Sequence, residues 1–113
     1  MLENLIIIGS GPAGYTAGLY SARANLSPIL FEGVESGGQL MLTTDVENYP
    51  GFKDGIMGPD LMSEFKLQAE KFGTKILPHN VISVKKSNEG FEVSTNADSF
   101  ITRAVIISTG ASA

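Results

Sequence analysis

Cysteine is absent from this sequence of 113 residues. Disulfides, thiolate metal sites and Cys-x-x-Cys redox pairs all need cysteine, so the chain can form none of them. Basic residues are few as well: eight Lys and Arg stand against twelve Asp and Glu, and the formal net charge is −4. Lys85-Lys86 is the only basic cluster, which argues against a surface for nucleic acid or an anionic membrane.

Long apolar runs are missing too, since none approaches the ~20 residues that span a bilayer. The N-terminus lacks the basic segment and apolar core of a signal peptide, and we therefore expect a cytoplasmic protein without a membrane span. The length suits one domain, and a hydrophobic content of 42% is enough to form a core. The one histidine, His79, lies between Pro78 and Asn80 and is predicted to be a turn residue rather than a catalyst.

The first motif is a glycine-rich turn that follows an apolar run. Leu5 to Ile8 show no alternation, which is typical of a strand buried on both faces of a parallel sheet. The next residues, Gly9-Ser10-Gly11-Pro12-Ala13-Gly14, fit the pattern G-x-G-x-x-G. In a dinucleotide site the first glycine permits a tight turn, the second lets a pyrophosphate approach the backbone, and the third lets the helix pack closely on the sheet. Free N–H groups at the start of that helix would then bind an anion without a basic side chain.

A carboxylate lies where this motif needs one. Residues 28–31 form a second apolar run that leads into Glu32. Glu32 follows Gly11 by about 20 positions, the spacing of an acid that hydrogen-bonds ribose hydroxyls, and an acid there disfavours the 2′-phosphate of NADP. The alternative is a structural glycine turn followed by a surface glutamate. The flanking strands favour a site for an ADP-containing dinucleotide.

The remaining patterns predict an α/β fold. A helix is expected over residues 12–24, with Tyr15 and Tyr20 at the edges of its small-residue face, and a second helix from Gly58 to a stop at Gly73. The expected class is a mainly parallel Rossmann-type sheet with helices, covered by a three-stranded antiparallel meander. Strands are expected at residues 28–32, 75–77, 81–85, 91–95 and 100–102, and a separate central strand from 104 returns toward the glycine turn.

Residues 33–58 form a long segment whose apolar residues follow no convincing helix or strand periodicity. It contains the blocks GGQL, from Gly37, and VENYPG, from Val46. Such a segment is either a disordered insertion or a loop that contacts a ligand. Its apolar residues, Leu40, Tyr49 and Phe52 among them, favour the ligand-contacting loop.

Together the blocks GSGPAG, GGQL, VENYPG and ISTGASA resemble the N-terminal half of the FAD domain of low-molecular-weight thioredoxin reductases, in the pyridine nucleotide-disulfide oxidoreductase family. The resemblance covers essentially the whole chain. GSGPAG and STGA are shared by many two-dinucleotide flavoproteins, whereas GGQL followed by TxxVENYPG is more specific to this family. The resemblance implies a Rossmann-like FAD-binding fold, FAD as cofactor and NADPH as electron donor. It also implies thioredoxin and a second copy of the chain as partners.

The resemblance assigns residues to the adenosine end of FAD by position. It places Ser10, Gly11, Pro12 and Ala13 at the pyrophosphate. It places Glu32 at the adenosine ribose and the backbone of Val81 at the adenine. Adjoining residues expected to complete the cofactor site are Gly9, Gly14, Phe31, Gly33, Leu40 and Ala111.

Other positions match the flavin end. Gly38 and Gln39 match the loop along the cofactor, and Asn48 matches a contact at the flavin. Thr109 and Gly110 match the strand end beside the isoalloxazine ring. None of these residues is expected to act as an acid, base or nucleophile, because the flavin carries the chemistry.

The sequence also departs from the family. There, the chain continues into an NADPH domain with a Cys-x-x-Cys pair and returns to the FAD domain through a Gly-Asp motif. By resemblance, residues 1–113 are the N-terminal segment of an FAD-binding domain, hence an incomplete domain, and are expected to be redox-incompetent alone. Three alternatives stay open: a non-enzymatic FAD or ADP module, the FAD lobe of a ferredoxin-NADP reductase or an alkyl hydroperoxide reductase subunit, and half of an NAD-dependent dehydrogenase.

Overall fold

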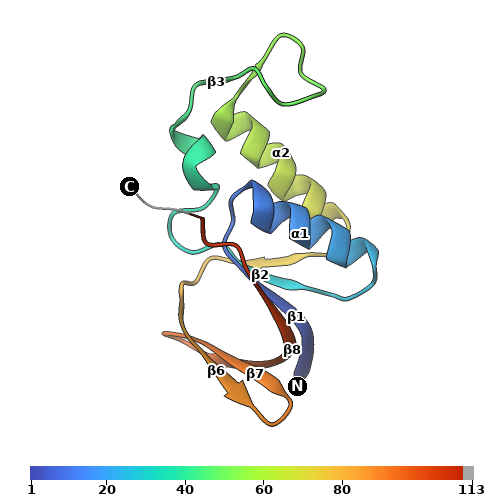
Figure 1. The fold of residues 1–113 in the computed structure, drawn as a ribbon, viewed down its shortest axis with the longest axis vertical. Helices are drawn as coiled ribbons and strands as arrows, with labels where there is room; N and C mark the ends of the chain where they lie inside the picture. Colours follow the sequence, from blue (N-terminus) through green and yellow to red (C-terminus); the bar gives the residue numbers. More distant parts are fainter. Residues whose placement is uncertain (111–113) are drawn as a thin grey trace.

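The computed structural model describes residues 1–110, and its main element is a six-stranded sheet built around β1 (Leu2–Ile8) (Figure 1). β2 (Ile29–Phe31) and β8 (Ser99–Ile107) flank β1 and run parallel to it. Ile6 and Ile7, in the middle of the apolar run, are fully buried. The prediction of a central parallel strand, covered on both faces, is therefore confirmed.

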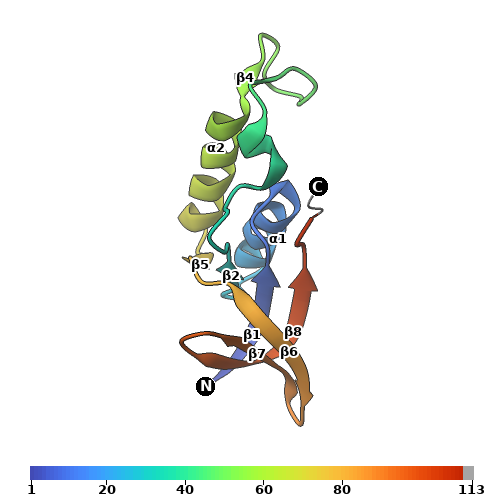
Figure 2. The same ribbon diagram turned by 90° about the vertical axis from the view of Figure 1, so that its left-hand side faces the viewer.

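The sheet is mixed, with the order β5-β2-β1-β8-β7-β6. β5 (Lys75–Leu77) pairs parallel with β2 at one edge. At the other end β6 (Val81–Ser87), β7 (Gly90–Thr95) and the first half of β8 form an antiparallel meander. In Figure 2 the β6–β7 hairpin crosses the direction of β1, as expected for a strongly twisted sheet.

Two apolar clusters cover the two faces of the parallel strands. On one face, Leu5, Ile7 and Leu30 pack against Tyr15 and Met62, which come from the two helices. On the other face, residues of β1 and β2 pack against Val93 of β7, and the rings of Phe31 and Phe100 meet edge to face at 5.3 Å. The meander thus covers the face that the helices leave open, as predicted.

The antiparallel and parallel parts share one strand, which the sequence did not predict. Separate strands were expected at residues 100–102 and from 104, but β8 is continuous from Ser99 to Ile107. Its residues 99–102 pair with β7, and its residues 101–107 pair with β1. Thr102, at the changeover, is fully buried and its hydroxyl donates to the carbonyl of Ala104 at 3.0 Å. Pairing with two neighbours in succession makes the strand continuous.

Helix α1 (Pro12–Arg23) begins at the glycine turn and helix α2 (Gly58–Lys71) at the Gly-Pro-Asp sequence, both close to the predicted bounds. Tyr20 is exposed, but Tyr15 is 2% exposed, so the expectation that Tyr15 lies at the edge of the helix face was wrong. Its ring packs with Leu5, Ile7 and Leu30 in the cluster beneath the helices. Within residues 1–110, no helix has the length and apolar character to cross a membrane.

The segment between β2 and α2 is ordered by short elements. A 3-10 helix, η1 (Gly38–Leu42), packs near α2, and β3 (Asp45–Val46) pairs antiparallel with β4 (Ile56–Met57). The Gly58 N–H donates to the Thr44 carbonyl at 2.8 Å, which joins this segment to the start of α2. Figure 2 shows β4 and its loop at the end of the molecule furthest from β6 and β7.

One edge of β8 is open within the described residues 1–110, because β7 stops pairing at Thr102 while β1 continues to Ile107. We predict that the 113-residue chain self-associates through residues 103–107, whose unpaired backbone groups and exposed Ile107 offer a template for another strand. Ile107→Lys should shift a concentration-dependent sedimentation profile toward monomer. Leu67→Lys, on the exposed face of α2, should leave the profile unchanged.

Two observations together would contradict self-association through this edge. The chain would sediment as a monomer at every concentration, and each amide from Val105 to Ile107 would be strongly protected from hydrogen exchange.

Candidate functional site

The carboxyl ends of the parallel strands meet at one edge of the sheet. Ile8 of β1 is in register with Phe31 of β2 and Ile107 of β8, and Phe31 is in register with Leu77 of β5. An open cavity of about 260 Å³ lies at this edge. Most of the predicted cofactor residues line it: Gly9, Ser10, Gly11, Phe31, Glu32, Gly33, Gly38, Gln39, Val81, Thr109 and Gly110.

The other predicted site residues lie elsewhere. Pro12, Ala13 and Gly14 form the first turn of α1, and Leu40 lies in η1, beside the cavity but not among its lining residues. Asn48 lines a separate surface hollow with its neighbours in the loop between β3 and β4. Ala111 lies outside the described residues.

The cavity also contains residues that the sequence did not single out as site residues. These are Ile8, Glu35, His79, Asn80 and Ser108. Ile8, Asn80 and Ser108 directly adjoin predicted site residues at strand ends, and His79 lies two residues before Val81, so position relative to the strands was the signal that could have found these four. His79 is exposed and lies between β5 and β6, where a connecting residue was predicted.

Two of the motif glycines are required by the protein itself. Gly9 has φ +114°, and a Cβ on it would overlap the carbonyl oxygen of Ser108, just after β8. A Cβ on Gly14 would overlap the carbonyl oxygen of Gly9. The Gly9 N–H donates to the Phe31 carbonyl at 3.0 Å. The turn and close-packing roles predicted for these glycines agree with this geometry.

Gly11 differs from both. Its φ of −77° suits any residue, and the nearest atom to a Cβ built there is the Cα of Gly38, at an ordinary contact distance of 3.8 Å. Because Gly11 lines the cavity, a side chain at this position would occupy cavity space without colliding with the protein. This is the arrangement needed where a ligand approaches the backbone closely.

The start of α1 lies next to this open space. Gly11 is its N-cap and Pro12 its first residue, and no side chain among residues 1–110 caps it. Its first turn contains no acidic residue. The amide groups and the positive dipole end of a 12-residue helix therefore remain available to an anion in the cavity.

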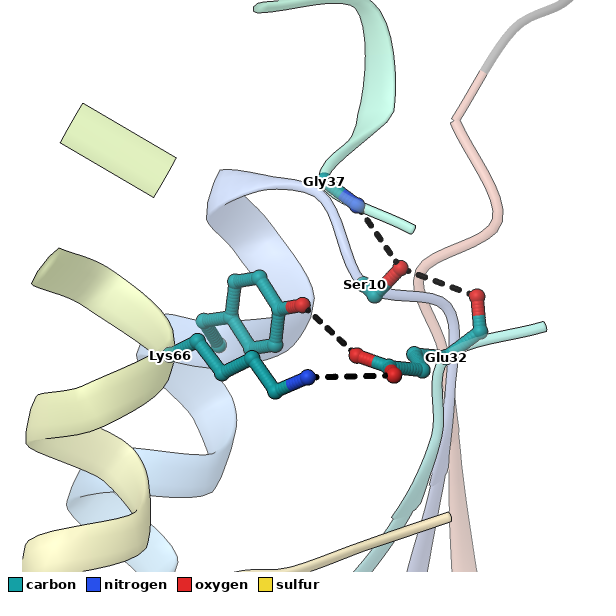
Figure 3. A network of polar contacts seen from close by, with 5 residues as sticks. Ser10, Glu32, Gly37 and Lys66 are labelled. Atoms are coloured by element: carbon teal, nitrogen blue, oxygen red, sulfur yellow. Dashed lines mark hydrogen bonds and ion pairs between the residues drawn. The ribbon is translucent and has the colours of Figure 1, made fainter. Parts of the chain in front are cut away.

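Ser10 connects three segments around the cavity. Its hydroxyl donates to the backbone carbonyl of Glu32 at 2.9 Å and accepts from the Gly37 N–H at 3.1 Å (Figure 3). The glycine turn, the end of β2 and the start of η1 are thereby held together. A Cβ on Gly38 would come within 3.0 Å of the Cα of Gly11, so the backbones of the two glycine-rich segments are in contact.

The Glu32 carboxylate is held from both helices. Its Oε2 accepts from the Tyr15 hydroxyl at 3.0 Å, and its Oε1 accepts from Lys66 Nζ at 3.2 Å (Figure 3). Burial raises the pKa of the Tyr15 hydroxyl well above its ordinary value, and the adjacent Glu32 carboxylate raises it further. Tyr15 therefore keeps its proton at neutral pH and remains a donor to Glu32. The sequence analysis identified Glu32 but neither of its two partners.

The geometry suits the binding of a ligand. The polar elements of the site include the backbone of a glycine turn, a helix N-terminus and one carboxylate held by two donors. An elongated ligand with an anionic centre and hydroxyl groups would match these elements from the start of α1 to the end of β2.

Comparison with known proteins agrees with the sequence resemblance. The family described as pyridine nucleotide-disulphide oxidoreductase matches residues 3–113. The thioredoxin reductase of Streptomyces clavuligerus is 56% identical over 114 residues, covering 96% of this chain and 34% of that protein. That of Chlamydia pneumoniae is 55% identical over 114 residues, covering 98% of this chain and 37% of that protein.

Solved structures share the fold. The thioredoxin reductase of Streptococcus pyogenes superposes with a TM-score of 0.91 at 41% identity, covering 98% of this chain and 36% of that one. The thioredoxin reductase of Lactococcus lactis superposes with a TM-score of 0.91 at 39% identity, covering 98% of this chain and 36% of that one. The chain thus spans about a third of the length of these relatives. Since the family match extends over nearly all of its residues, the chain belongs to the pyridine nucleotide-disulphide oxidoreductase family.

Proposed function

We propose that this chain is the N-terminal FAD-binding segment of a thioredoxin reductase. The observation that carries the proposal is the open space at Gly11, beside the uncapped start of α1 and opposite a held carboxylate. A pyrophosphate suits the start of α1, and an adenosine ribose suits the carboxylate. The resemblance of the blocks GSGPAG, GGQL and VENYPG to the FAD domain of thioredoxin reductases favours FAD over other dinucleotides in this role.

Each part of the cavity has a task under this proposal. The backbone of Ser10 to Ala13 binds the pyrophosphate, and Glu32 accepts hydrogen bonds from the adenosine ribose. Gly38 and Gln39 line the path of the cofactor, and Val81 contacts the adenine. Further cofactor contacts fall to Gly9, Gly14, Phe31, Gly33, Leu40, Thr109, Gly110 and Ala111.

Asn48 contacts the flavin end in this proposal, although in the described structure it lies in a different hollow from the pyrophosphate turn. When bound, FAD would supply the two-electron redox chemistry. The chain itself binds and orients the cofactor, and the carboxyl ends of its strands β1 and β8 face the cofactor.

The full activity needs parts that these 113 residues do not provide. In the proposed reaction, electrons pass from NADPH through FAD to a thioredoxin disulfide, and the thiol pair and NADPH site belong to another region of the protein. Thioredoxin and a second copy of the chain are the proposed partners, and the cytoplasm is the proposed location. The cysteine-free composition also leaves a second candidate, a module that binds FAD or ADP without catalysis.

The first prediction separates the ligand-facing glycine from a packing glycine. Gly11→Ala should keep the unfolding temperature of the unsubstituted chain but bind FAD at least about tenfold more weakly, because the added methyl enters the cavity. Gly14→Ala should instead destabilise the fold, since its Cβ overlaps the Gly9 carbonyl. Quenching of flavin fluorescence measures the binding, and NAD serves as a competitor.

Unchanged FAD affinity in Gly11→Ala would make the turn purely structural and remove the main support for the proposal. Binding of NAD in preference to FAD would favour the dehydrogenase alternative.

The second prediction concerns the ribose. Glu32→Ala should cost ~1.5–3 kcal/mol of binding free energy, a loss of roughly 10- to 150-fold in FAD affinity. It should also lower stability, because the buried Tyr15 hydroxyl loses its acceptor. Isothermal titration and thermal unfolding measure the two effects. Glu35→Ala, at an exposed carboxylate lining the same cavity, is the matched control and should change both much less.

Equal effects of the two substitutions would sink the ribose assignment, as would a folded Glu32→Ala variant with undiminished affinity.

The third prediction is a negative one. The 113-residue chain, saturated with FAD and supplied with NADPH, should not reduce thioredoxin or a chromogenic disulfide. A thiolate is needed to attack a disulfide, and the chain has no cysteine. It also has a single G-x-G-x-x-G motif, which is assigned to FAD. Free FAD is the blank, and the Streptomyces clavuligerus enzyme is the positive control. Turnover well above the blank would refute the proposal that the thiol pair and the NADPH site lie outside these 113 residues.

A further inference from the structure

Glu32 lines the cavity, yet its side chain is only 11% exposed, because two helices reach it. Tyr15 approaches one carboxylate oxygen from α1 and Lys66 approaches the other from α2. Figure 3 shows the carboxylate turned toward Lys66, while the Glu32 backbone faces Ser10. A glutamate at a strand end has several rotamers in solution, and two donors on different elements select one of them.

The two contacts leave the carboxylate able to accept more hydrogen bonds. An ionised carboxylate offers about four lone-pair sites, and Tyr15 and Lys66 use one on each oxygen. The remaining sites belong to a side chain that lines the cavity. A ribose hydroxyl in the cavity would therefore meet an acceptor whose orientation is already fixed, which lowers the entropy lost on binding.

Lys66 is not required to attach α2 to the sheet. Leu61, Met62 and Ala69 bury the apolar face of this helix at 1%, 2% and 0% exposure. The Lys66 side chain is itself 37% exposed, in contrast to these three buried residues. Among the described residues that line the cavity, none belongs to α2. The ion pair with Glu32 is therefore a direct polar link from this helix to a residue that lines the cavity.

We propose that Lys66, with Tyr15, is a positioning residue that orients Glu32 for the 2′-hydroxyl of the adenosine ribose. This inference rests on the proposed function, because it takes the ligand to be an adenosine dinucleotide. It extends the site to α2, which is outside the glycine motif and outside the cavity wall. The pair acts through Glu32 and touches no ligand itself.

The test compares two small probes, ADP and 2′-deoxy-ADP, in competition with FAD. The unsubstituted chain should prefer ADP by roughly tenfold, the value of one hydrogen bond to a charged acceptor. Lys66→Met keeps an unbranched side chain of nearly the same length but removes the charge, and it should reduce that preference to about twofold or less, chiefly by weakening the binding of ADP. Tyr15→Phe should act in the same direction while its ring still fills the core.

Two further variants act as controls. Lys66→Arg keeps a cationic donor and should retain the preference for ADP. Lys71→Met removes a lysine from the last turn of the same helix, beside the Phe72 ring, and should change nothing. Thermal unfolding of each variant checks that it is folded.

Three outcomes would overturn the inference. Lys66→Met could keep the full preference for ADP, or it could weaken both probes equally, as a purely structural residue would. The unsubstituted chain could bind FAD without preferring ADP to 2′-deoxy-ADP, which would remove the contact that Lys66 is argued to orient. A chain that binds neither FAD nor ADP would instead refute the proposed function, and the two failures are thereby distinguishable.

Discussion

The contact of three backbone segments at the end of β1 is the constraint on which the rest of the structure depends. Gly9 lies against the Ser108 carbonyl, and Gly14 lies against the Gly9 carbonyl. A side chain at either glycine would push α1 away from the sheet or separate β1 from β8. Because neither Gly9 nor Gly14 has a side chain, the first turn of α1 lies directly over the ends of two parallel strands. The cavity exists because backbone, rather than side chains, forms this corner.

Much of the fold could be predicted because several local patterns each favour one structure. An unbroken apolar run such as Leu5 to Ile8 is typical of a strand buried on both faces, and Gly58 with Pro59 marks the start of a helix. The continuity of β8 could not be predicted in this way. Its residues 99–102 mix polar and apolar side chains and pair antiparallel with β7, whereas its apolar residues 104–107 pair parallel with β1. Which neighbours a strand pairs with is a tertiary property, and here the neighbours change within one strand.

The candidate site could likewise be predicted only in part. Glycine spacing and the strand-end acid lie within one β-α-β unit, so the sequence could identify Gly11 and Glu32. The partners that hold Glu32 come from positions 17 and 34 residues away, on two helices whose relative placement depends on core packing. Tyr15 was expected at the edge of the small-residue face of its helix. The structure buries the ring and uses its hydroxyl to reach Glu32.

In the proposed cofactor site, Gly11 contributes its backbone to recognition and Glu32 contributes its side chain. A helix N-terminus attracts any anion and cannot tell one diphosphate ester from another. Selectivity for a ribose needs an acceptor at a fixed place, and a single glutamate at a strand end would be free to rotate. Tyr15 on α1 and Lys66 on α2 remove that freedom by each binding one carboxylate oxygen. Because Lys66 lies on α2, the proposed recognition of the ribose depends on how this helix packs on the sheet. This holds although α2 contributes no residue to the cavity wall.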